Sequence, residues 1–171
     1  MNPPKILIAC IGNIFLGDDA FGVEVARALS ARSLPANVKL VDFGIRGWDL
    51  TYALMEDHDA VILVDAVPRG EAPGTLYLIE PDANDAGSSR QDIQLDAHNL
   101  DPAKVLRLAA SLGGRQNRIL LVGCEPTPMD SEQDMAMGLS DAVGAAIPQA
   151  LNMIESLLNE WNSTEHLAER S

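Results

Sequence analysis

Three consecutive segments decide the fold: KILIACI at 5–11, GNIFLGDD at 12–19 and AFGVEVARALSA at 20–31. The first is a continuous apolar run, which is typical of a short strand buried on both faces. The second ends in Asp18 and Asp19, so we expect a loop that places both acidic residues at the start of a helix, where the helix dipole favours negative charge. The third has its apolar residues on one helical face: Phe21, Val25, Ala28 and Leu29.

Similar segments follow along the rest of the chain. Strands are predicted at 37–43, 60–64, 75–80 and 118–122, and helices at 48–55, 102–112 and, with Ser140 as its cap, 141–161. This alternation predicts a single-domain α/β fold: a doubly wound, mostly parallel sheet of about five strands with helices on both faces. The strand at 75–80 alternates in pattern, which indicates a sheet edge. We expect the domain to span 1–161, followed by a flexible C-terminal tail at 162–171.

The composition is strongly acidic. The 171 residues include 25 Asp and Glu against 12 Lys and Arg, a formal net charge of -13. The negative electrostatic field of such a protein repels nucleic acid and anionic membranes, so we expect neither as a partner. The charge is compatible with a cation or a basic peptide as partner, and also with a role in solubility alone. No signal peptide or transmembrane run is recognisable, which favours the cytoplasm. Cys10 and Cys124 end apolar runs and form no CxxC pair, so we expect neither a disulfide framework nor a thiolate zinc site.

Three chemically suitable side chains are expected at one end of the sheet. In open α/β sheets, ligands bind beyond the carboxyl ends of the strands, where the strand order reverses. Asp19 follows the first predicted strand, Asp65 ends the third, and His98 lies in the long polar loop after the edge strand. Two carboxylates and an imidazole suit nickel, zinc or iron and leave a coordination position open. The spacing also allows Asp18 and Asp19 to be helix caps, Asp65 to accept backbone N–H groups, and His98 to be an ordinary surface residue.

Other patterns carry less chemistry. The sequence contains no dinucleotide-binding GxGxxG, Walker, HExxH or GxSxG motif. Arg46, between two glycines at the same end of the sheet, is a candidate substrate contact or simply an exposed loop arginine. Asn13 is expected to hold the first loop through side-chain bonds to the backbone. We expect His58 and His166 to be surface residues.

The order of several motifs resembles that of the hydrogenase maturation endopeptidases. They are IGNIFLGDDAFG at 11–22, DFGIRG at 42–47, LVDA at 63–66, PGT at 73–75, AHN at 97–99 and VGCEP at 122–126. The resemblance departs in two places: some members have Glu where this chain has Asp19, and Ala20 replaces a glycine that is often found after the acidic pair. The second departure matters only if that position needs a positive φ.

The resemblance implies an activity and a set of site residues. Family members remove a C-terminal extension from the large subunit of a nickel–iron hydrogenase after nickel insertion. Their metal-contacting residues correspond to Asp19, Asp65 and His98, and the nickel is carried by the substrate, although other divalent metals could occupy such a site in vitro. Either the ion activates water or the scissile carbonyl, or Asp19 and Asp65 act as an aspartyl-protease-like acid/base pair.

Two further expectations remain open at this point. A different class of function uses the same three residues, namely a non-catalytic accessory factor that binds nickel or a metalloprotein during hydrogenase assembly. Residue identity cannot distinguish that factor from the enzyme, but turnover can. We also expect a monomer whose partner is the hydrogenase large-subunit precursor.

Overall fold

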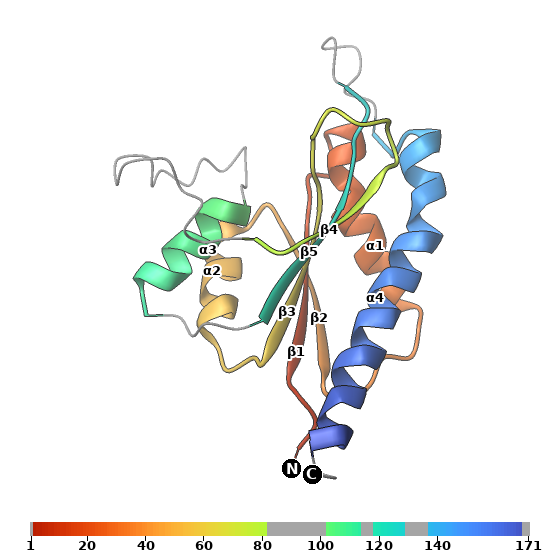
Figure 1. Cartoon of the computed structure of the whole chain (residues 1–171). Coiled ribbons are helices and arrows are strands. Elements are labelled where there is room, and N and C mark those ends of the chain that lie inside the picture. Colours follow the sequence, from red (N-terminus) through yellow and green to blue (C-terminus); the bar gives the residue numbers. More distant parts are fainter. Residues whose placement is uncertain (1, 82–101, 114–117, 129–136, 169–171) are drawn as a thin grey trace.

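The chain builds one sheet from five strands within the residues that the structure describes, which are 2–81, 102–113, 118–128 and 137–168 of a computed structural model. The strands are β1 (Ile6–Ile11), β2 (Val38–Gly44), β3 (Ala60–Ala66), β4 (Leu76–Ile79) and β5 (Arg118–Cys124). They are arranged in the order β2-β1-β3-β5-β4, and only β4 runs antiparallel to its neighbour. The parallel strands all run upward in Figure 1.

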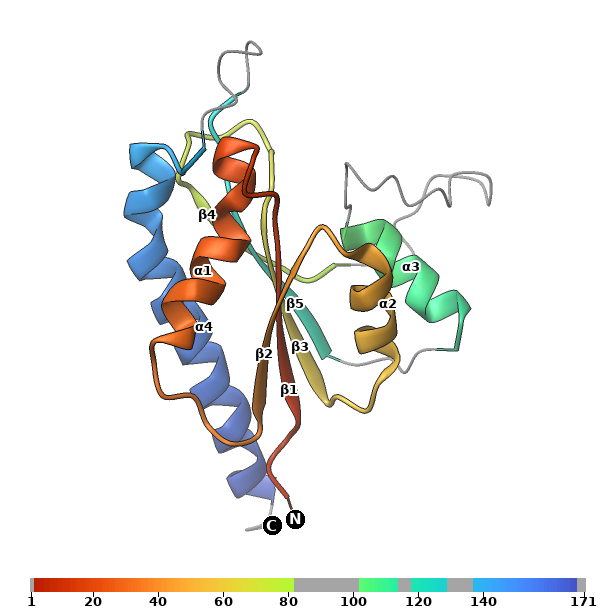
Figure 2. The ribbon, with the colours of Figure 1, turned by 180° about the vertical axis from the view of Figure 1, so that it is seen from behind.

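The helices lie in two layers. They are the 3-10 turn η1 (Gly17–Ala20), α1 (Phe21–Ser30), α2 (Gly47–Met55), α3 (Pro102–Ser111) and α4 (Asp141–Ala168). Figures 1 and 2 show α1 and α4 on one face of the sheet and α2 and α3 on the other. The chain therefore has the three-layer arrangement that strands alternating with helices predict.

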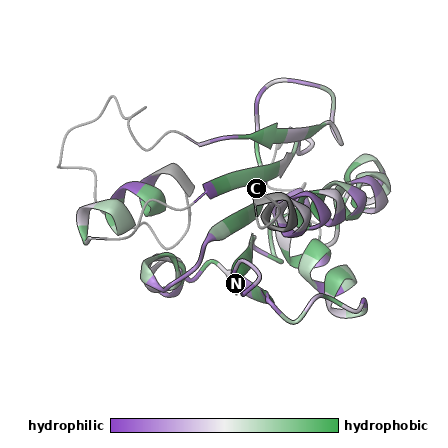
Figure 3. Cartoon of the chain, turned by 60° about the horizontal axis from the view of Figure 1, so that its bottom comes forward, coloured by the Kyte–Doolittle hydropathy of each residue, from purple (hydrophilic) through white to green (hydrophobic). Residues whose placement is uncertain are grey.

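Two hydrophobic clusters fill the spaces between the layers. In β1, Ile6, Ile8 and Cys10 belong to the cluster under α1 and α4, whereas Leu7, Ala9 and Ile11 belong to the cluster under α2 and α3. The strand is buried at every position because alternate side chains enter opposite clusters. Figure 3 shows the same organisation, with hydrophobic colour along the central strands and hydrophilic colour on the outer side of α4.

The predicted fold class is confirmed, with differences at element ends. The β3 strand continues through Asp65 to Ala66, so Asp65 lies inside the strand and pairs with Gly123. The α4 helix continues to Ala168 instead of ending near Trp161, because the polar residues that follow contain no glycine or proline. It also passes through Pro148 without interruption. Within the described residues, no helix is both long and apolar enough to cross a membrane.

The strand order places the site expected from the sequence. Because β2 and β3 pair with opposite sides of β1, the order reverses between β1 and β3. The last β1–β3 pair is Cys10 with Val64, so Asp65 follows immediately at the carboxyl end. A ligand site is expected at this point in doubly wound sheets. We call the loops and turns that follow β1, β2, β3 and β5 the carboxyl end of the sheet.

Candidate functional site

The loop after β1 is held against the sheet by two glycines. A Cβ on Gly12 would lie 2.4 Å from the carbonyl oxygen of Asp19, so only glycine fits where the loop folds back on itself. A Cβ on Gly22 would lie 2.0 Å from the carbonyl oxygen of Ile11 and 2.6 Å from that of Val64. The start of α1 therefore rests directly on β1 and β3. This close approach brings η1 into contact with β3, the strand that contains Asp65.

Asn13 organises the loop as the sequence predicts. Its side-chain oxygen accepts a hydrogen bond from the backbone N–H of Phe15 at 2.9 Å, the geometry of an Asx turn. Its own backbone N–H donates to the carboxylate of Asp19 at 3.2 Å. The residue thus shapes the loop and also contacts the candidate catalytic side chain.

Asp19 lies in η1, half-buried, at the carboxyl end of the sheet. Burial raises the pKa of Asp19 above its ordinary value, and the hydrogen bond from the Asn13 N–H only partly opposes this. A carboxylate that is partly removed from water gains more than an exposed one from a cation or a proton placed against it. Asp19 is therefore suited either to bind a metal ion or to exchange a proton.

Asp65 is 6% exposed, near the end of β3. Its carboxylate accepts a hydrogen bond from the N–H of Ala66 at 2.8 Å. Asp65 therefore accepts a backbone N–H group, which is one of the alternatives that the sequence leaves open. This bond does not exclude the chemical role, because a carboxylate has several lone pairs and the bond uses one of them.

His98 lies outside the described residues, so its position relative to Asp19 and Asp65 is not tested. Within residues 2–81, 102–113, 118–128 and 137–168, no group of three His, Cys, Asp or Glu side chains is arranged to hold a metal ion. The metal site expected from the sequence needs His98 as its third member. It therefore remains a prediction.

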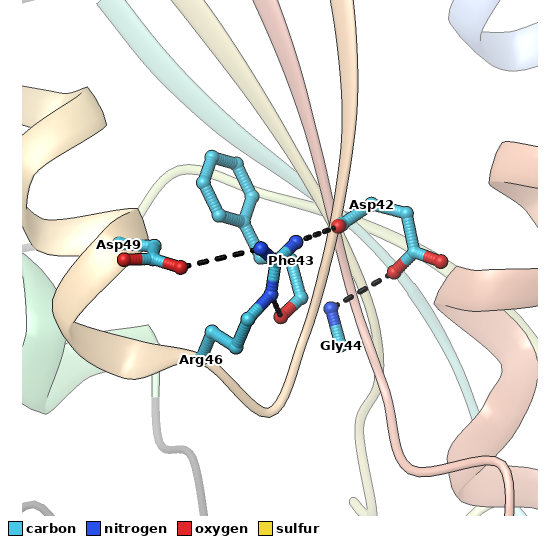
Figure 4. Close-up of polar contacts among 5 residues, drawn as sticks. All are labelled: Asp42, Phe43, Gly44, Arg46 and Asp49. Carbon is cyan, nitrogen blue, oxygen red and sulfur yellow. Dashed lines mark hydrogen bonds and ion pairs between the residues drawn. The ribbon is translucent and has the colours of Figure 1, made fainter.

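Arg46 folds back onto its own turn. Its guanidinium donates to the carbonyl oxygens of Asp42 at 2.6 Å and Phe43 at 3.2 Å, and to the carboxylate of Asp49 at 3.3 Å (Figure 4). These bonds join the end of β2 to the first turn of α2. The side chain is nevertheless exposed, so part of the guanidinium remains accessible at the carboxyl end of the sheet.

Asp18 has a role that the sequence pattern did not reveal. Neither Asp18 nor Asp19 caps α1, whose N-cap is Ala20 without any side-chain cap bond. The Asp18 carboxylate is 8% exposed and accepts bonds from the Ser140 N–H at 2.7 Å, the Ser140 hydroxyl at 2.9 Å and the Thr127 N–H at 2.8 Å. Burial alone would raise its pKa, but the bonds from Ser140 and Thr127 outweigh burial and hold the pKa of Asp18 below its ordinary value.

Glu125 is a second buried carboxylate that the sequence did not single out. It accepts bonds from the N–H groups of Arg69 at 2.8 Å and Gly70 at 2.9 Å, and from the hydroxyl of Tyr77 at 2.7 Å. Its own N–H donates to the carbonyl of Thr75 at 2.8 Å. Glu125 thereby fixes the loop that leads from Asp65 to β4. The only sequence signal was its place in the VGCEP motif, which gives no indication of these partners.

His58 and the two cysteines do not extend the site, and the side chain of His166 lies outside the described part of the chain. The expectation that His58 is a surface residue is wrong: it is 7% exposed, its N–H donates to the Glu56 carbonyl at 3.0 Å, and its Nε2 lies 3.4 Å from the Glu56 carboxylate. It precedes β3 and so lies at the opposite end of the sheet. Cys10 and Cys124 are free, buried thiols, as expected, and burial raises the pKa of each, which disfavours a reactive thiolate.

Comparison with known proteins yields one consistent result. The sequence model of a family described as hydrogenase maturation protease matches residues 23–157. The hydrogenase 2 maturation protease of Escherichia coli is 32% identical over 158 residues, which are 91% of this chain and 92% of that protein.

Solved structures resemble the chain over nearly its whole length. The hydrogenase maturating endopeptidase HybD from E. coli has a TM-score of 0.70 at 29% identity, covering 91% of this chain and 93% of that one. A [NiFe] hydrogenase maturation protease from Thermococcus kodakarensis, at 23% identity, shares the fold with a TM-score of 0.66 over 91% and 93% of the two chains.

Proposed function

The chain belongs to the hydrogenase maturation protease family and is an endopeptidase, and we propose that it removes the C-terminal extension of a nickel-loaded [NiFe]-hydrogenase large-subunit precursor. One structural observation supports this proposal most: the turn that contains Asp19 lies against β3, the strand that contains Asp65, and the strand order reverses between β1 and β3. Family membership favours turnover over the accessory-factor alternative, since a protease cleaves its partner and does not merely bind it.

The substrate's nickel is proposed to dock between Asp19, Asp65 and His98. Carboxylate and imidazole ligands suit a divalent ion of borderline softness, and other divalent metals could occupy the same residues in vitro. Both aspartates are partly or fully removed from water, so an arriving cation replaces lost hydration. Cleavage then depends on nickel loading, because only the loaded precursor supplies the ion that these ligands favour.

Two versions of the chemistry are compatible with this geometry. In the first, the substrate's ion polarises the scissile carbonyl or lowers the pKa of an attacking water. In the second, the ion serves recognition only, and Asp19 and Asp65 share a proton as an acid/base pair. Proton sharing requires two carboxyls so close that both cannot ionise at once. Asp19 and Asp65 are the candidates for such a pair, because the turn that contains Asp19 lies against the strand that contains Asp65.

The surface beside Asp19 is suited to a polypeptide substrate. Large apolar side chains are exposed on the loop after β1 and on the β2–α2 turn and helix: Ile14, Phe15, Ile45, Trp48 and Tyr52. The two segments are joined by a hydrogen bond of 3.0 Å from the Gly12 N–H to the Gly44 carbonyl. Exposed apolar groups gathered near a site are typical of protein-binding surfaces. We place the precursor here, with Arg46 as an additional contact, and we place the enzyme in the cytoplasm as a monomer.

Matched substitutions of the two aspartates test the proposal. Asp19→Asn and Asp65→Asn are each expected to lower cleavage of nickel-loaded precursor by roughly 100-fold or more, as for loss of a residue that acts on the reacting atoms. Cleavage is followed by mass spectrometry of the released peptide, and nickel-dependent docking by pull-down. The control is Asp57→Asn, the same chemical change at an exposed position that pairs with Lys5 at the opposite end of the sheet.

The outcomes separate the two versions of the mechanism. If Asp65→Asn abolishes cleavage but docking still requires nickel, the acid/base version gains support. Loss of both cleavage and docking favours the metal-ligand version. Wild-type cleavage rates for both Asp19→Asn and Asp65→Asn would contradict the proposed site.

A further inference from the structure

We infer that Asp18 is a positioning residue for this endopeptidase, because its buried carboxylate fixes the turn that presents Asp19; this inference rests on the role proposed for Asp19. Asp18 itself does not face the proposed reaction. Both of its oxygens are engaged by groups far along the chain: Oδ1 by the Ser140 N–H, and Oδ2 by the Thr127 N–H and the Ser140 hydroxyl. Its side chain has little exposure through which to contact a substrate.

The partners of Asp18 are themselves well placed to act as an anchor. Thr127 lies three residues after the end of β5, and Ser140 immediately precedes α4. The two residues also contact each other through their hydroxyls at 3.1 Å. Ser140 is further fixed by its capping of α4, where its carbonyl accepts the Gly144 N–H at 2.9 Å. Asp18 is therefore bonded at once to the segment that follows β5 and to the residue that precedes the longest described helix.

The fixed position of Asp18 is transmitted to Asp19 through a very short turn. The two residues are consecutive in η1, and the Asp19 N–H donates to the Leu16 carbonyl at 3.0 Å. On the other side, the Asn13 N–H lies 3.2 Å from both the carbonyl and the carboxylate of Asp19. Asp19 is thus held between Asn13 and Asp18, with no freely rotating segment on either side. A shift of Asp18 must displace the Asp19 carboxylate.

Close backbone contacts at two glycines limit the directions in which the turn can move if Asp18 shifts. Gly12 lies so close to the Asp19 carbonyl, and Gly22 so close to the Ile11 and Val64 carbonyls, that the turn has little room to adjust inward. If the Asp18 bonds are lost, the turn can relax only outward, away from β3 and Asp65. Small displacements of catalytic groups are costly, since a misplacement of about 1 Å can reduce a rate roughly 100-fold.

Asp18→Asn tests this inference with little change in size. An amide offers one acceptor oxygen in place of two, so one of the backbone N–H groups of Thr127 and Ser140 must lose its partner. We expect kcat for precursor cleavage to fall roughly 10- to 100-fold while KM changes by less than about 3-fold, because the apolar docking surface is untouched. Amide hydrogen exchange of Asn13 and Asp19 should accelerate in the free enzyme, whereas core amides in β1 and β3 keep their protection.

Two additional variants complete the experiment. Asp141→Asn is the control, because it removes a carboxylate next to Ser140, in the first turn of α4. It is expected to leave kcat and the amide exchange rates of Asn13 and Asp19 at their wild-type values. Ser140→Ala removes the hydroxyl bond to Asp18, together with the contacts of that hydroxyl with Thr127 and the Val143 N–H, but keeps the bond from the Ser140 N–H to Asp18. It should therefore give a smaller fall in kcat with the same pattern of exchange. If Asp18→Asn does not fold, Ser140→Ala decides the question by the same two measurements.

A positioning role for Asp18 requires that its substitution both lowers kcat and accelerates the amide exchange of Asn13 and Asp19. A wild-type kcat, or faster exchange confined to Thr127 and Ser140 with Asn13 and Asp19 unchanged, would overturn the inference. Exchange needs no substrate, so it remains decisive for positioning even if the wild-type protein fails to cleave the precursor. That failure would instead count against the proposed function.

Discussion

At the scale of single residues, Asp18 and Asp19 acquire opposite properties from their surroundings. Both are acidic, consecutive and at least partly buried. Among the residues that the structure describes, three donors converge on Asp18 and favour its charged form, whereas one backbone N–H, that of Asn13, faces the Asp19 carboxylate and does not offset burial. The pKa is therefore lowered for Asp18 and raised for Asp19. Asp18 is thereby held as a charged group within the fold, and the raised pKa of Asp19 fits the chemistry proposed for it.

The pair of Glu125 and Tyr77 gives a residue-scale prediction. Burial, the hydrogen bond to Glu125 and its negative charge raise the pKa of Tyr77 to about 12. Because the folded-state pKa exceeds the unfolded value of about 10, the neutral hydroxyl contributes stability below about pH 10, and this contribution is lost as the pH rises towards 12. Glu125→Gln removes the negative charge beside the Tyr77 hydroxyl but leaves Tyr77 in the same position in the fold. The pKa of Tyr77 should therefore fall while remaining above its ordinary value.

Absorbance at the phenolate band measures this pKa directly. The chain has two tyrosines, so a Tyr52→Phe background leaves the titration of Tyr77 alone. Glu160→Gln in the same background is the control, because Glu160 lies on α4, where it pairs with Arg118. An unchanged Tyr77 titration in Glu125→Gln would show that Glu125 does not exert the effect assigned to it.

At the scale of elements, the junction of β1, η1 and α1 determines the site. A helix that begins directly above the carboxyl ends of two parallel strands needs a residue without a side chain at the contact, and Gly22 is that residue. The apolar run of β1 and the helical pattern that follows are local features, so the sequence predicts both elements. The contact of η1 with β3 is not local. It depends on how closely two backbones approach, which no pattern of residue types expresses.

Two glycine-to-alanine substitutions in helices should have opposite effects. Gly22→Ala places a methyl group within 2.0 Å of the Ile11 carbonyl oxygen, so α1 must move, and we expect a loss of about 3 kcal/mol in the free energy of unfolding. Gly144→Ala, in the first turns of α4, meets nothing within 4 Å and should add about 0.5–1 kcal/mol through helix propensity. Urea unfolding followed by circular dichroism measures both changes. Equal effects of the two substitutions would contradict the close contact assigned to Gly22.

At the scale of the whole molecule, the sequence predicts the architecture better than the connections within it. Continuous apolar strands separated by helical patterns specify a parallel sheet covered on both faces, and the structure confirms it. The strand order then brings the segments of Asp19 and Asp65 together. The bonds from Asp18 to Thr127 and Ser140 span more than 100 residues, and those from Glu125 span about 50. Such pairings follow from tertiary packing, so residue spacing cannot reveal them.

The candidate site was therefore only partly predictable. Asp19 and Asp65 could be placed because the ends of parallel strands meet at one end of a sheet. The buried carboxylates that support them could not, since the sequence pattern suggests only a helix cap for Asp18 and indicates no partner for Glu125. His98, the third proposed member, lies outside the described residues and stays a prediction.

Cleavage is proposed to depend on substrate nickel and on His98 together with the two aspartates. The most direct measurement incubates the protein with nickel-loaded and nickel-free large-subunit precursor, with His98→Ala in parallel, and follows the C-terminal peptide by mass spectrometry. We expect peptide release from the loaded precursor alone, and only with His98 intact. Equal release from loaded and nickel-free precursor, undiminished release by His98→Ala, or stable binding without any release would contradict the proposal.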